Sequence, residues 1–279
     1  MATRREIYNQ LYNIASELYD EGEARQIAEM LILAKGNISR NDLIIEPNKE
    51  ISINDLDSII TELRSWRPVQ YIIGYADFRD MELRVSEGVL IPRPETEELV
   101  EWIASETDKG ATILDIGTGS GAIAIALSRE VASSQVLAMD ISPEALTIAR
   151  DNGTRYAPNV VFVEGDALAN FETFNEKFDV VVSNPPYIPQ SDEMRMRKNV
   201  LDYEPSTALF VPDNDPLLFY RSIAQTSKKI LKREGKLYFE IYELLAHEMI
   251  AMLKDEGYSD VTLREDFRGK PRMICATLR

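Results

Sequence analysis

The chain has 279 residues, of which 44% are hydrophobic, enough to bury the core of one large domain or of a large and a small one. Its formal net charge of -16 opposes binding to phosphate backbones unless basic residues gather into one patch, so we expect no nucleic-acid substrate. The polar first ten residues, the lack of an apolar run near the roughly 18 residues of a membrane span and a single cysteine, Cys275, predict a cytoplasmic protein without membrane contacts or a disulfide framework.

The first 70 residues carry apolar side chains at helical spacing. The stripes are Ile7, Leu11, Ile14, Ala15 and Leu18, then Ile27, Ala28, Leu31 and Ile32, then Leu56, Ile59, Ile60 and Leu63. One-sided stripes of this kind pack against other helices. Ser52 and Asn54 are candidate caps of the third helix. Residues 1–70 are therefore predicted to form a small helical domain without a catalytic group.

A change of pattern marks the link to a second domain. Residues 71–85 are predicted to form a hairpin, with Gly74 and the pair Arg79-Asp80 as turn residues. The next domain, residues 86–279, opens on Ile91-Pro92-Arg93-Pro94-Glu95-Thr96-Glu97. Its prolines fix an extended segment, and the acidic residues from Glu95 suit the first turn of a helix.

Beyond Lys109 apolar strands alternate with helical segments, which is typical of a doubly wound, mostly parallel sheet in an α/β domain. The predicted strands are Thr112 to Asp115, Val136 to Asp140, Val160 to Val163, Phe178 to Ser183, Lys236 to Ile241, Val261 to Arg264 and Met273 to Thr277.

The first of these strands runs into a glycine-rich turn, Gly117-Thr118-Gly119-Ser120-Gly121, followed by a helix. Glycines allow close backbone approach to a ligand, and open α/β sheets bind nucleotides at this end of the strand. A dinucleotide fold or a structural turn remain alternatives. The third glycine comes one residue earlier than in the dinucleotide fingerprint, and the absence of Lys-Ser or Lys-Thr after the loop excludes a P-loop.

Two later strand ends add candidate contacts for the nucleotide. Asp140 ends the second strand, where its carboxylate can accept hydrogen bonds from both ribose hydroxyls of either NAD or S-adenosylmethionine. Its alternative role is to cap the helix that starts at Pro143, a role that Ser142 can also fill. After the third strand, Asp166 and its neighbours lie where an adenine ring could bind, with a plain loop carboxylate as the alternative.

The fourth strand ends in Asn184-Pro185-Pro186-Tyr187, which a doubly wound sheet places beside the glycine loop. The prolines stiffen the backbone, so the Asn184 side-chain oxygen and the Pro185 carbonyl can be fixed as two acceptors for one NH2 group, while the Tyr187 ring stacks on a planar amide or base. Such acceptors orient a delocalised, weakly nucleophilic nitrogen for attack on a methyl sulfonium. A proline-rich turn without chemistry is the alternative.

These motifs resemble the HemK/PrmC family, the peptide chain release factor N5-glutamine methyltransferases, over nearly the whole chain. The matching segments are Leu90 to Glu97, Asp115 to Ala124, Asp140-Ile141-Ser142 and Ser183 to Ile188. The resemblance implies a class I S-adenosylmethionine-dependent methyltransferase domain after a small helical, substrate-recognising domain. It also implies transfer to the glutamine of a Gly-Gly-Gln motif in release factors, a step that serves translation termination.

The resemblance assigns roles residue by residue, without a metal. Cofactor contacts fall on Gly117, Thr118, Gly119, Ser120, Gly121, Asp140, Ala167 and Asn184; substrate binding falls on Asn184, Pro185, Pro186 and Tyr187, with Asn184, Pro185 and Tyr187 as catalytic residues. The chain departs from the family at Ala167, often aromatic in relatives, at Phe78-Arg79-Asp80, at residues 211–216, which lack a glycine-rich stretch, and at Tyr242, where glycine is common.

Two other functions fit the same motifs. An adenine-N6 or guanine-N2 nucleic-acid methyltransferase would present a similar NH2 group to the tetrapeptide, although the acidic composition and the segment from Ile91 to Glu97 favour a protein substrate. The second alternative is a non-catalytic protein that keeps the fold and binds the cofactor but transfers no methyl group. Methyl transfer to a purified release factor separates all three.

Overall fold

The computed structural model of the chain describes residues 2–169, 174 and 177–279. Chain contacts divide it into two compact units, one of residues 1–75 and 196–203 and the other of residues 76–195 and 204–279. The predicted linking segment 71–85 is thus divided between the units. No sequence pattern indicated that residues 196–203 would join the N-terminal unit.

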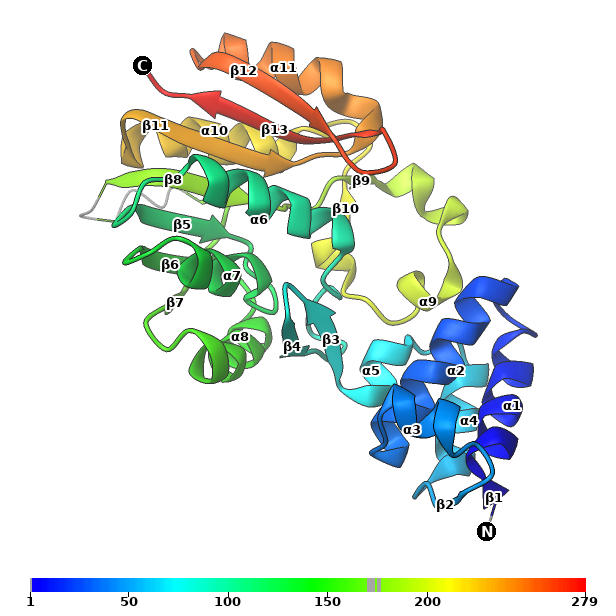
Figure 1. Ribbon diagram of the computed structural model, residues 1–279. Coiled ribbons are helices and arrows are strands. Elements are labelled where there is room, and N and C mark those ends of the chain that lie inside the picture. Colours follow the sequence, from blue (N-terminus) through cyan, green and yellow to red (C-terminus); the bar gives the residue numbers. More distant parts are fainter. Residues whose placement is uncertain (1, 170–173, 175–176) are drawn as a thin grey trace. The chain divides into compact units, whose positions relative to one another are not determined.

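The first unit is a bundle of short helices around an apolar core (Figure 1). Its core contains the predicted stripes except Leu18, with Leu56 only partly buried at its edge and Leu11, Leu31 and Leu63 fully buried. The elements of this unit are β1 (Ala2–Thr3), α1 (Arg4–Ala15), α2 (Glu21–Gly36), α3 (Arg40–Ile45), β2 (Glu50–Ile51), α4 (Leu56–Arg64), α5 (Val69–Ile73) and α9 (Lys198–Leu201). The prediction of Ser52 or Asn54 as a cap is wrong, because Asp55, in the left-handed region at φ 57°, precedes α4 without a side-chain cap.

The predicted hairpin is shorter than expected, because α5 takes up its first residues and Gly74 ends that helix at φ 94°. The hairpin itself pairs β3 (Tyr75–Phe78) with β4 (Met81–Arg84). Arg79 and Asp80 form its turn, as predicted, with φ of 47° and 58°. A two-residue hairpin turn of this kind needs positive φ at both central residues, which glycine, asparagine and aspartate adopt most readily.

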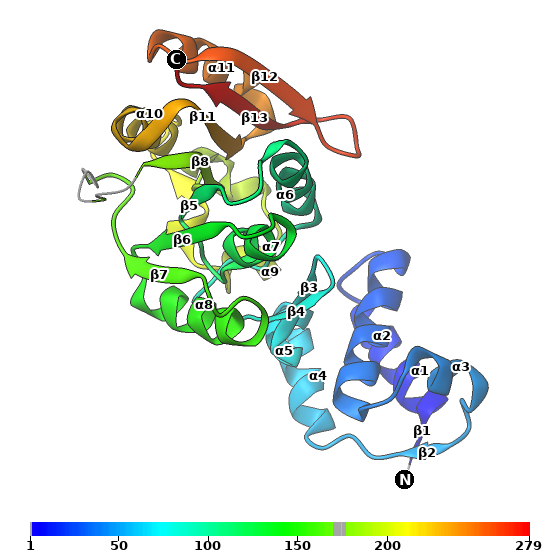
Figure 2. The same cartoon turned by 60° about the vertical axis from the view of Figure 1, so that its left-hand side comes forward.

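Seven strands among the described residues form the main sheet, in the order β12-β13-β11-β8-β5-β6-β7 (Figure 2). The five strands from β11 to β7 run parallel, and β13 is antiparallel to both of its neighbours. The strands are β5 (Thr112–Ile116), β6 (Gln135–Asp140), β7 (Val161–Glu164), β8 (Phe178–Ser183), β11 (Leu231–Glu240), β12 (Ser259–Glu265) and β13 (Pro271–Thr277). The predicted doubly wound, mostly parallel sheet is confirmed.

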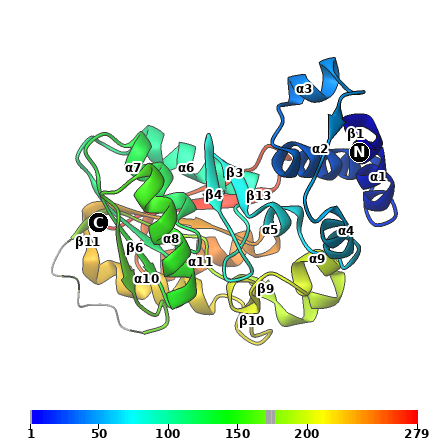
Figure 3. The ribbon, with the colours of Figure 1, turned by 90° about the horizontal axis from the view of Figure 1, so that it is seen from below.

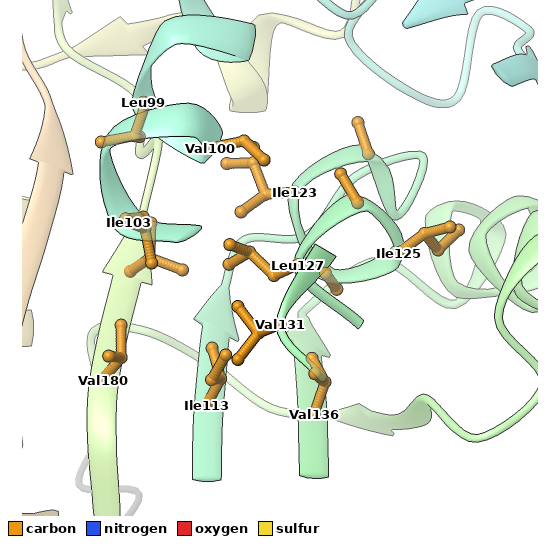
Figure 4. Close-up of a cluster of buried hydrophobic side chains, with 14 of the residues drawn as sticks. Leu99, Val100, Ile103, Ile113, Ile123, Ile125, Leu127, Val131, Val136 and Val180 are labelled. Atoms are coloured by element: carbon orange, nitrogen blue, oxygen red, sulfur yellow. The ribbon is translucent and has the colours of Figure 1, made fainter. Parts of the chain in front are cut away.

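Helices cover both faces of the sheet, with α6 and α7 on one side and α10 on the other (Figure 3). Alternating strand residues point to opposite faces, so Ile113 and Val180 pack beneath α6 and α7, whereas Leu114 and Val181 join the core of α10 and α11. Figure 4 shows the first of these cores. The helices are α6 (Pro94–Glu106), α7 (Ala122–Glu130), α8 (Pro143–Tyr156), α10 (Leu218–Ile230) and α11 (Ala246–Asp255).

Short elements complete the second unit. The parallel pair β9 (Ile188–Pro189) and β10 (Phe210–Val211) follows β8, and the 3-10 turns are η1 (Gln190–Arg195), η2 (Ser206–Ala208) and η3 (Glu243–Leu245). Cys275 lies buried in β13, as predicted. Within the described part of the chain, every helix is too short or too polar to cross a membrane.

Candidate active site at the carboxyl ends of the strands

Three neighbouring parallel strands end side by side at the candidate site. Ile116 of β5 is in register with Ser183 of β8, and Ser183 is in register with Phe239 of β11. The Ser183 hydroxyl donates a buried hydrogen bond of 2.7 Å to the Ile116 carbonyl, which fixes this register. The next residues along the strands, Gly117, Asn184 and Glu240, therefore lie next to one another. The predicted placement of the tetrapeptide beside the glycine loop is confirmed.

The glycine loop presents open space at two of its three glycines. Gly117, Gly119 and Gly121 all have positive φ, at 75°, 56° and 85°. A Cβ atom at Gly117 or Gly119 would meet nothing within 4 Å, whereas one at Gly121 would lie 2.9 Å from Ile125 Cδ1. The first two glycines thus leave room for a ligand. Gly121 instead allows tight packing at the start of α7, a role that the sequence analysis did not assign to it.

A buried carboxylate lies directly beneath this loop. Asp115 is fully buried, and its Oδ2 accepts a 2.7 Å hydrogen bond from the Thr118 hydroxyl. Its Oδ1 has no hydrogen-bond partner among the described residues. Burial raises the pKa of Asp115 to about 7, opposed in part by the hydrogen bond from Thr118 and by the nearby backbone N–H of Ala124. In the sequence, Asp115 stood out only as the end of a strand and the first residue of a family-matching segment, although an acidic residue inside a buried parallel strand itself indicates a special role.

The other loop residues of the predicted site are held by the backbone around them. Ser120 is buried, and its carbonyl accepts a 2.9 Å hydrogen bond from the Asn152 side chain. Asp140 accepts hydrogen bonds from the Gly119 N–H at 2.8 Å and from the Ser142 N–H at 2.9 Å. The cap of α8 is Ser142, whose hydroxyl oxygen accepts from Ala145 N–H at 3.2 Å. The capping role considered for Asp140 therefore belongs to Ser142.

The loop after β7 lies against the end of β6. Gly165 N–H donates to the Asp140 carbonyl at 3.0 Å. Asp166 Oδ1 accepts from Leu168 N–H at 2.8 Å, so this carboxylate stabilises its own turn, as the alternative interpretation held. The Ala167 carbonyl accepts a 2.8 Å hydrogen bond from Ser222 of α10. Ala167 itself is half-buried and packs against the core on that side of the sheet.

The Asn-Pro-Pro-Tyr segment is anchored at both ends. The Asn184 Nδ2 donates to Thr96 Oγ1 of α6 over 3.4 Å. The backbone N–H groups of Tyr187 and Ile188 donate to the Leu209 carbonyl at 3.3 Å and 2.9 Å, and the chain continues into the β9–β10 pair. Pro185 is buried and Pro186 is half-buried. The segment is thus a rigid turn whose side chains are held at fixed positions.

Two residues that the sequence analysis did not select, Thr96 and Glu240, connect the ends of this turn. Glu240 is buried; its Oε2 accepts a 2.6 Å hydrogen bond from the Thr96 hydroxyl, and its Oε1 accepts one of 3.2 Å from the Tyr187 hydroxyl. Burial raises the pKa of Glu240, and hydrogen bonds from Thr96 and Tyr187 and the charge of Arg272 oppose the shift. Burial likewise raises the pKa of Tyr187, so its hydroxyl keeps its proton. The feature of the sequence that could have identified Glu240 is its position as a charged residue directly after the apolar run Leu237 to Phe239.

The departures from the family pattern have structural partners. The Tyr242 ring stacks on Tyr187, with centroids 6.1 Å apart and planes 13° apart, and its hydroxyl donates to Asp192 at 2.8 Å. In the loop of residues 211–216, Asp213 accepts a 2.8 Å hydrogen bond from Ser191 N–H. In the hairpin turn, the Arg79 guanidinium bonds both oxygens of Glu130, at 2.8 Å and 2.6 Å. Tyr242 thus extends the aromatic surface of the candidate substrate side.

Among the described residues, no group of three or more His, Cys, Asp and Glu side chains is arranged to hold a metal ion. The sheet order with its single antiparallel strand, the open glycine loop after β5 and the rigid Asn-Pro-Pro-Tyr turn after β8 together define a methyltransferase of the class I fold. A family model described as a methyltransferase domain matches residues 113–202. A crystal structure of a methyltransferase from Pyrococcus furiosus shares this fold, with a TM-score of 0.54 and 18% identity over 71% of this chain and 89% of that one.

Comparison with curated proteins narrows the class to a family. A release factor glutamine methyltransferase from Flavobacterium psychrophilum is 38% identical over 97% of both chains, and one from Bacteroides thetaiotaomicron is 45% identical over 84% of both. A family model described as the PrmC N-terminal domain matches residues 11–74. The chain therefore belongs to the release factor glutamine methyltransferase family, and it is an enzyme that transfers methyl groups.

Proposed function

We propose that this enzyme transfers a methyl group from S-adenosylmethionine to the side-chain amide nitrogen, N5, of the glutamine in the Gly-Gly-Gln motif of peptide chain release factors. The observation that carries the proposal is the alignment of strand ends, which places Asn184 next to the open loop at Gly117. Two relatives named for this reaction match most of the chain. The proposal includes action in the cytoplasm, on translation termination.

The residues around the glycine loop fit the proposed cofactor. Gly117 and Gly119 leave open space for it, and the unpaired Asp115 Oδ1 is a buried polar atom that a polar ligand can satisfy. The residues proposed to hold it are Gly117, Thr118, Gly119, Ser120, Gly121, Asp140, Ala167 and Asn184. When bound, the cofactor supplies a methyl group on a positively charged sulfur. Asp140 keeps free lone pairs for ribose hydroxyls, since a carboxylate has about four acceptor positions and two are used here.

On the substrate side, the turn provides two acceptors and an aromatic face. Asn184 Oδ1 and the Pro185 carbonyl are proposed to accept the two hydrogens of the glutamine NH2 group, while Pro186 and the Tyr187 ring enclose the amide plane. An amide nitrogen is a weak nucleophile because its lone pair is delocalised. Acceptors fixed before the reaction orient the nitrogen and stabilise the positive charge that it gains. Asn184, Pro185 and Tyr187 are thus the proposed catalytic residues.

The N-terminal helical domain is proposed to recognise the release factor. Its stripes form an ordinary core, and the chemical groups of the site come from the second unit. The net charge of -16 suits a partner with basic patches and disfavours direct binding to nucleic acid.

Methyl transfer to a purified release factor tests the proposal. The full-length enzyme, S-adenosylmethionine and the release factor are incubated together, and peptides are analysed by mass spectrometry. We expect the mass of one methyl group on the glutamine of the Gly-Gly-Gln peptide, and none when that glutamine is replaced in the factor. Parallel reactions contain single-stranded DNA and RNA oligonucleotides. Methylation of the oligonucleotides alone, or cofactor binding without transfer to any of them, would reject the proposal.

A further inference from the structure

The side-chain amide of Asn184 can contribute to the proposed reaction in only one of its two orientations. With Oδ1 toward the substrate it accepts a hydrogen from the glutamine NH2 group, whereas with Nδ2 there it would oppose one donor with another. The Nδ2 atom instead faces Thr96 Oγ1 at 3.4 Å. Whatever fixes this contact therefore decides whether the turn accepts a substrate NH2 group.

The contact with Thr96 depends on a hydrogen bond further back. A threonine hydroxyl has one hydrogen to donate and lone pairs to accept with. Thr96 donates its hydrogen to Glu240 Oε2 over 2.6 Å, the shorter of its two contacts. The hydrogen bonds from Thr96 and Tyr187 and the charge of Arg272 favour the ionised form of Glu240 against the effect of burial. Because an ionised carboxylate has no hydrogen to offer, Thr96 is left as the acceptor for Asn184 Nδ2. The other oxygen of Glu240 accepts from the Tyr187 hydroxyl over 3.2 Å.

From this chain of donors and acceptors we infer that Glu240 is a positioning residue, which sets the orientation of the Asn184 amide through Thr96 and fixes the Tyr187 ring directly. The inference rests on the proposed function, since the correct orientation is defined by a substrate NH2 group. The groups involved come from β11, α6 and the turn after β8. Glu240 thus connects both side chains of the reactive turn to the rigid sheet.

Position 240 requires a carboxylate, because both of its side-chain oxygens must accept a hydrogen bond, one from Thr96 and one from Tyr187. A glutamine or a protonated glutamate would offer one acceptor and one donor, so either Thr96 or Tyr187 would face a donor. Glu240 is 1% exposed, which leaves little access for water to repair a mismatch. The charged groups around it are Arg272 and Glu95. Arg272 forms an ion pair with Asp266, at 3.1 Å, and keeps this partner when Glu240 is replaced.

The test uses single and double variants of the full-length enzyme on release factor. Glu240→Gln and Thr96→Val should each lower kcat by about 10- to 100-fold, as expected for a misplaced catalytic group. KM for S-adenosylmethionine should change much less than kcat, since most of its proposed contacts, in the glycine loop and at Asp140, are unchanged. Thr96→Ser keeps the hydroxyl and should keep most of the activity. A normal kcat for Glu240→Gln, or a loss with Thr96→Ser as large as with Thr96→Val, would overturn the inference.

Double variants separate positioning from a general effect of charge. When Tyr187→Phe removes one donor, the amide introduced by Glu240→Gln can turn its single acceptor to Thr96, so the further loss from Glu240→Gln should fall below about threefold. The further loss from Glu240→Gln should also fall below about threefold when Thr96→Val is present, because the introduced glutamine amide can then turn its single acceptor to Tyr187. A role of Glu240 through its charge alone predicts the same loss in every background, which would contradict the inference.

A measurement without substrate distinguishes this inference from the proposed function. The enzyme is labelled with 15N-asparagine, and the Asn184 side-chain amide signal is identified by its absence in Asn184→Ala. The signal should shift in Thr96→Val and Glu240→Gln and stay near the wild-type position in Thr96→Ser. An unchanged signal in all three variants would overturn the positioning role even if the wild type methylates release factor. If the signal shifts in the variants as expected but the wild type does not methylate release factor, only the proposed substrate is rejected.

Discussion

The carboxylate of Asp140, at the end of β6, accepts a 2.8 Å hydrogen bond from the backbone N–H of Gly119 in the loop after β5. Its second oxygen accepts from Ser142 N–H, which holds the turn into α8. The Asp140 side chain thus holds both the loop after β5 and the loop after β6, at the carboxyl ends of these neighbouring strands. The half-buried carboxylate retains acceptor positions for a ligand, so its structural contacts and its proposed ribose contact are compatible.

Asp140→Ala should weaken S-adenosylmethionine binding by about 1.5 to 3 kcal/mol, because it removes charged hydrogen bonds to the ribose and releases Gly119. Asp140→Asn is the matched control, since it keeps one acceptor oxygen and should lose less. Isothermal calorimetry on the folded variants measures both. An affinity equal to that of the wild type in Asp140→Ala would remove Asp140 from the cofactor site.

Asn184→Ala should lower the single-turnover rate of methyl transfer by roughly 100-fold or more, as for other preorganised groups that stabilise developing charge. The loss in cofactor affinity should be smaller, because the glycine loop and Asp140 are unchanged. Rapid-quench measurements give the rate, and calorimetry on the same preparation gives the affinity. A rate close to that of the wild type would exclude Asn184 from the reaction.

The sheet was predictable because its strands are short apolar runs separated by helical segments, a pattern that local sequence carries. From the parallel arrangement it followed that the residues after Ile116 and Ser183 would be neighbours, and the register shows that they are. The glycine loop and the Asn-Pro-Pro-Tyr turn could therefore be placed together before the structure was known. Boundaries moved by a residue or a few, as at β11, which starts at Leu231.

Polar contacts between distant segments were not predictable. Thr96 and Glu240 are far apart in sequence, and nothing local shows that they share a hydrogen bond. Tyr242 was noted only as a departure from the family, and its stacking on Tyr187 depends on the tertiary fold. The same limit explains the N-terminal unit, where residues 196–203 pack through contacts such as the 2.9 Å bond from Tyr203 to the Ser65 carbonyl. Local periodicity predicts elements, whereas these contacts depend on how the elements meet.

Asp115 should make stability fall as pH rises. Burial raises its pKa from an ordinary 3.8 to about 7, so between these pH values the native state holds a proton that the unfolded chain has released. The native state binds more protons there, and the free energy of unfolding therefore decreases with rising pH. Asp115→Asn stays neutral and avoids this loss. Its unfolding free energy should rise relative to the wild type, by a few kcal/mol, between about pH 4 and about pH 8.

Urea titrations of both proteins without cofactor, at several pH values, measure this difference. The amide oxygen introduced by Asp115→Asn can still accept from Thr118, which makes the variant a close structural match to the protonated wild type. Parallel pH curves for the two proteins would show that Asp115 is ionised in the native state throughout this range.

Removal of residues 1–75, the larger part of the N-terminal unit, should leave the chemical groups of the site in place and remove most of the proposed recognition surface, so the fragment should begin at Ala76. A start near Ser86 would remove the β3–β4 hairpin, although its backbone is bonded to α8: Arg84 N–H donates to Asn152 at 2.7 Å and Glu82 N–H to the Tyr156 hydroxyl at 3.0 Å. Asn152 also supports the glycine loop at Ser120. The fragment from Ala76 retains these contacts and should bind S-adenosylmethionine with nearly the affinity of the full-length enzyme.

The fragment should methylate intact release factor with a much lower kcat/KM than the full-length enzyme, because binding energy from remote contacts no longer positions the glutamine. On a short Gly-Gly-Gln peptide, which offers no such contacts, the two proteins should have similar kcat/KM. The full-length enzyme should also lose efficiency on the intact factor as salt rises, if acidic surface meets basic patches. Equal kcat/KM of both proteins on intact factor would refute the recognition role, and an equal loss on factor and peptide would indicate instead that the fragment's own site is damaged.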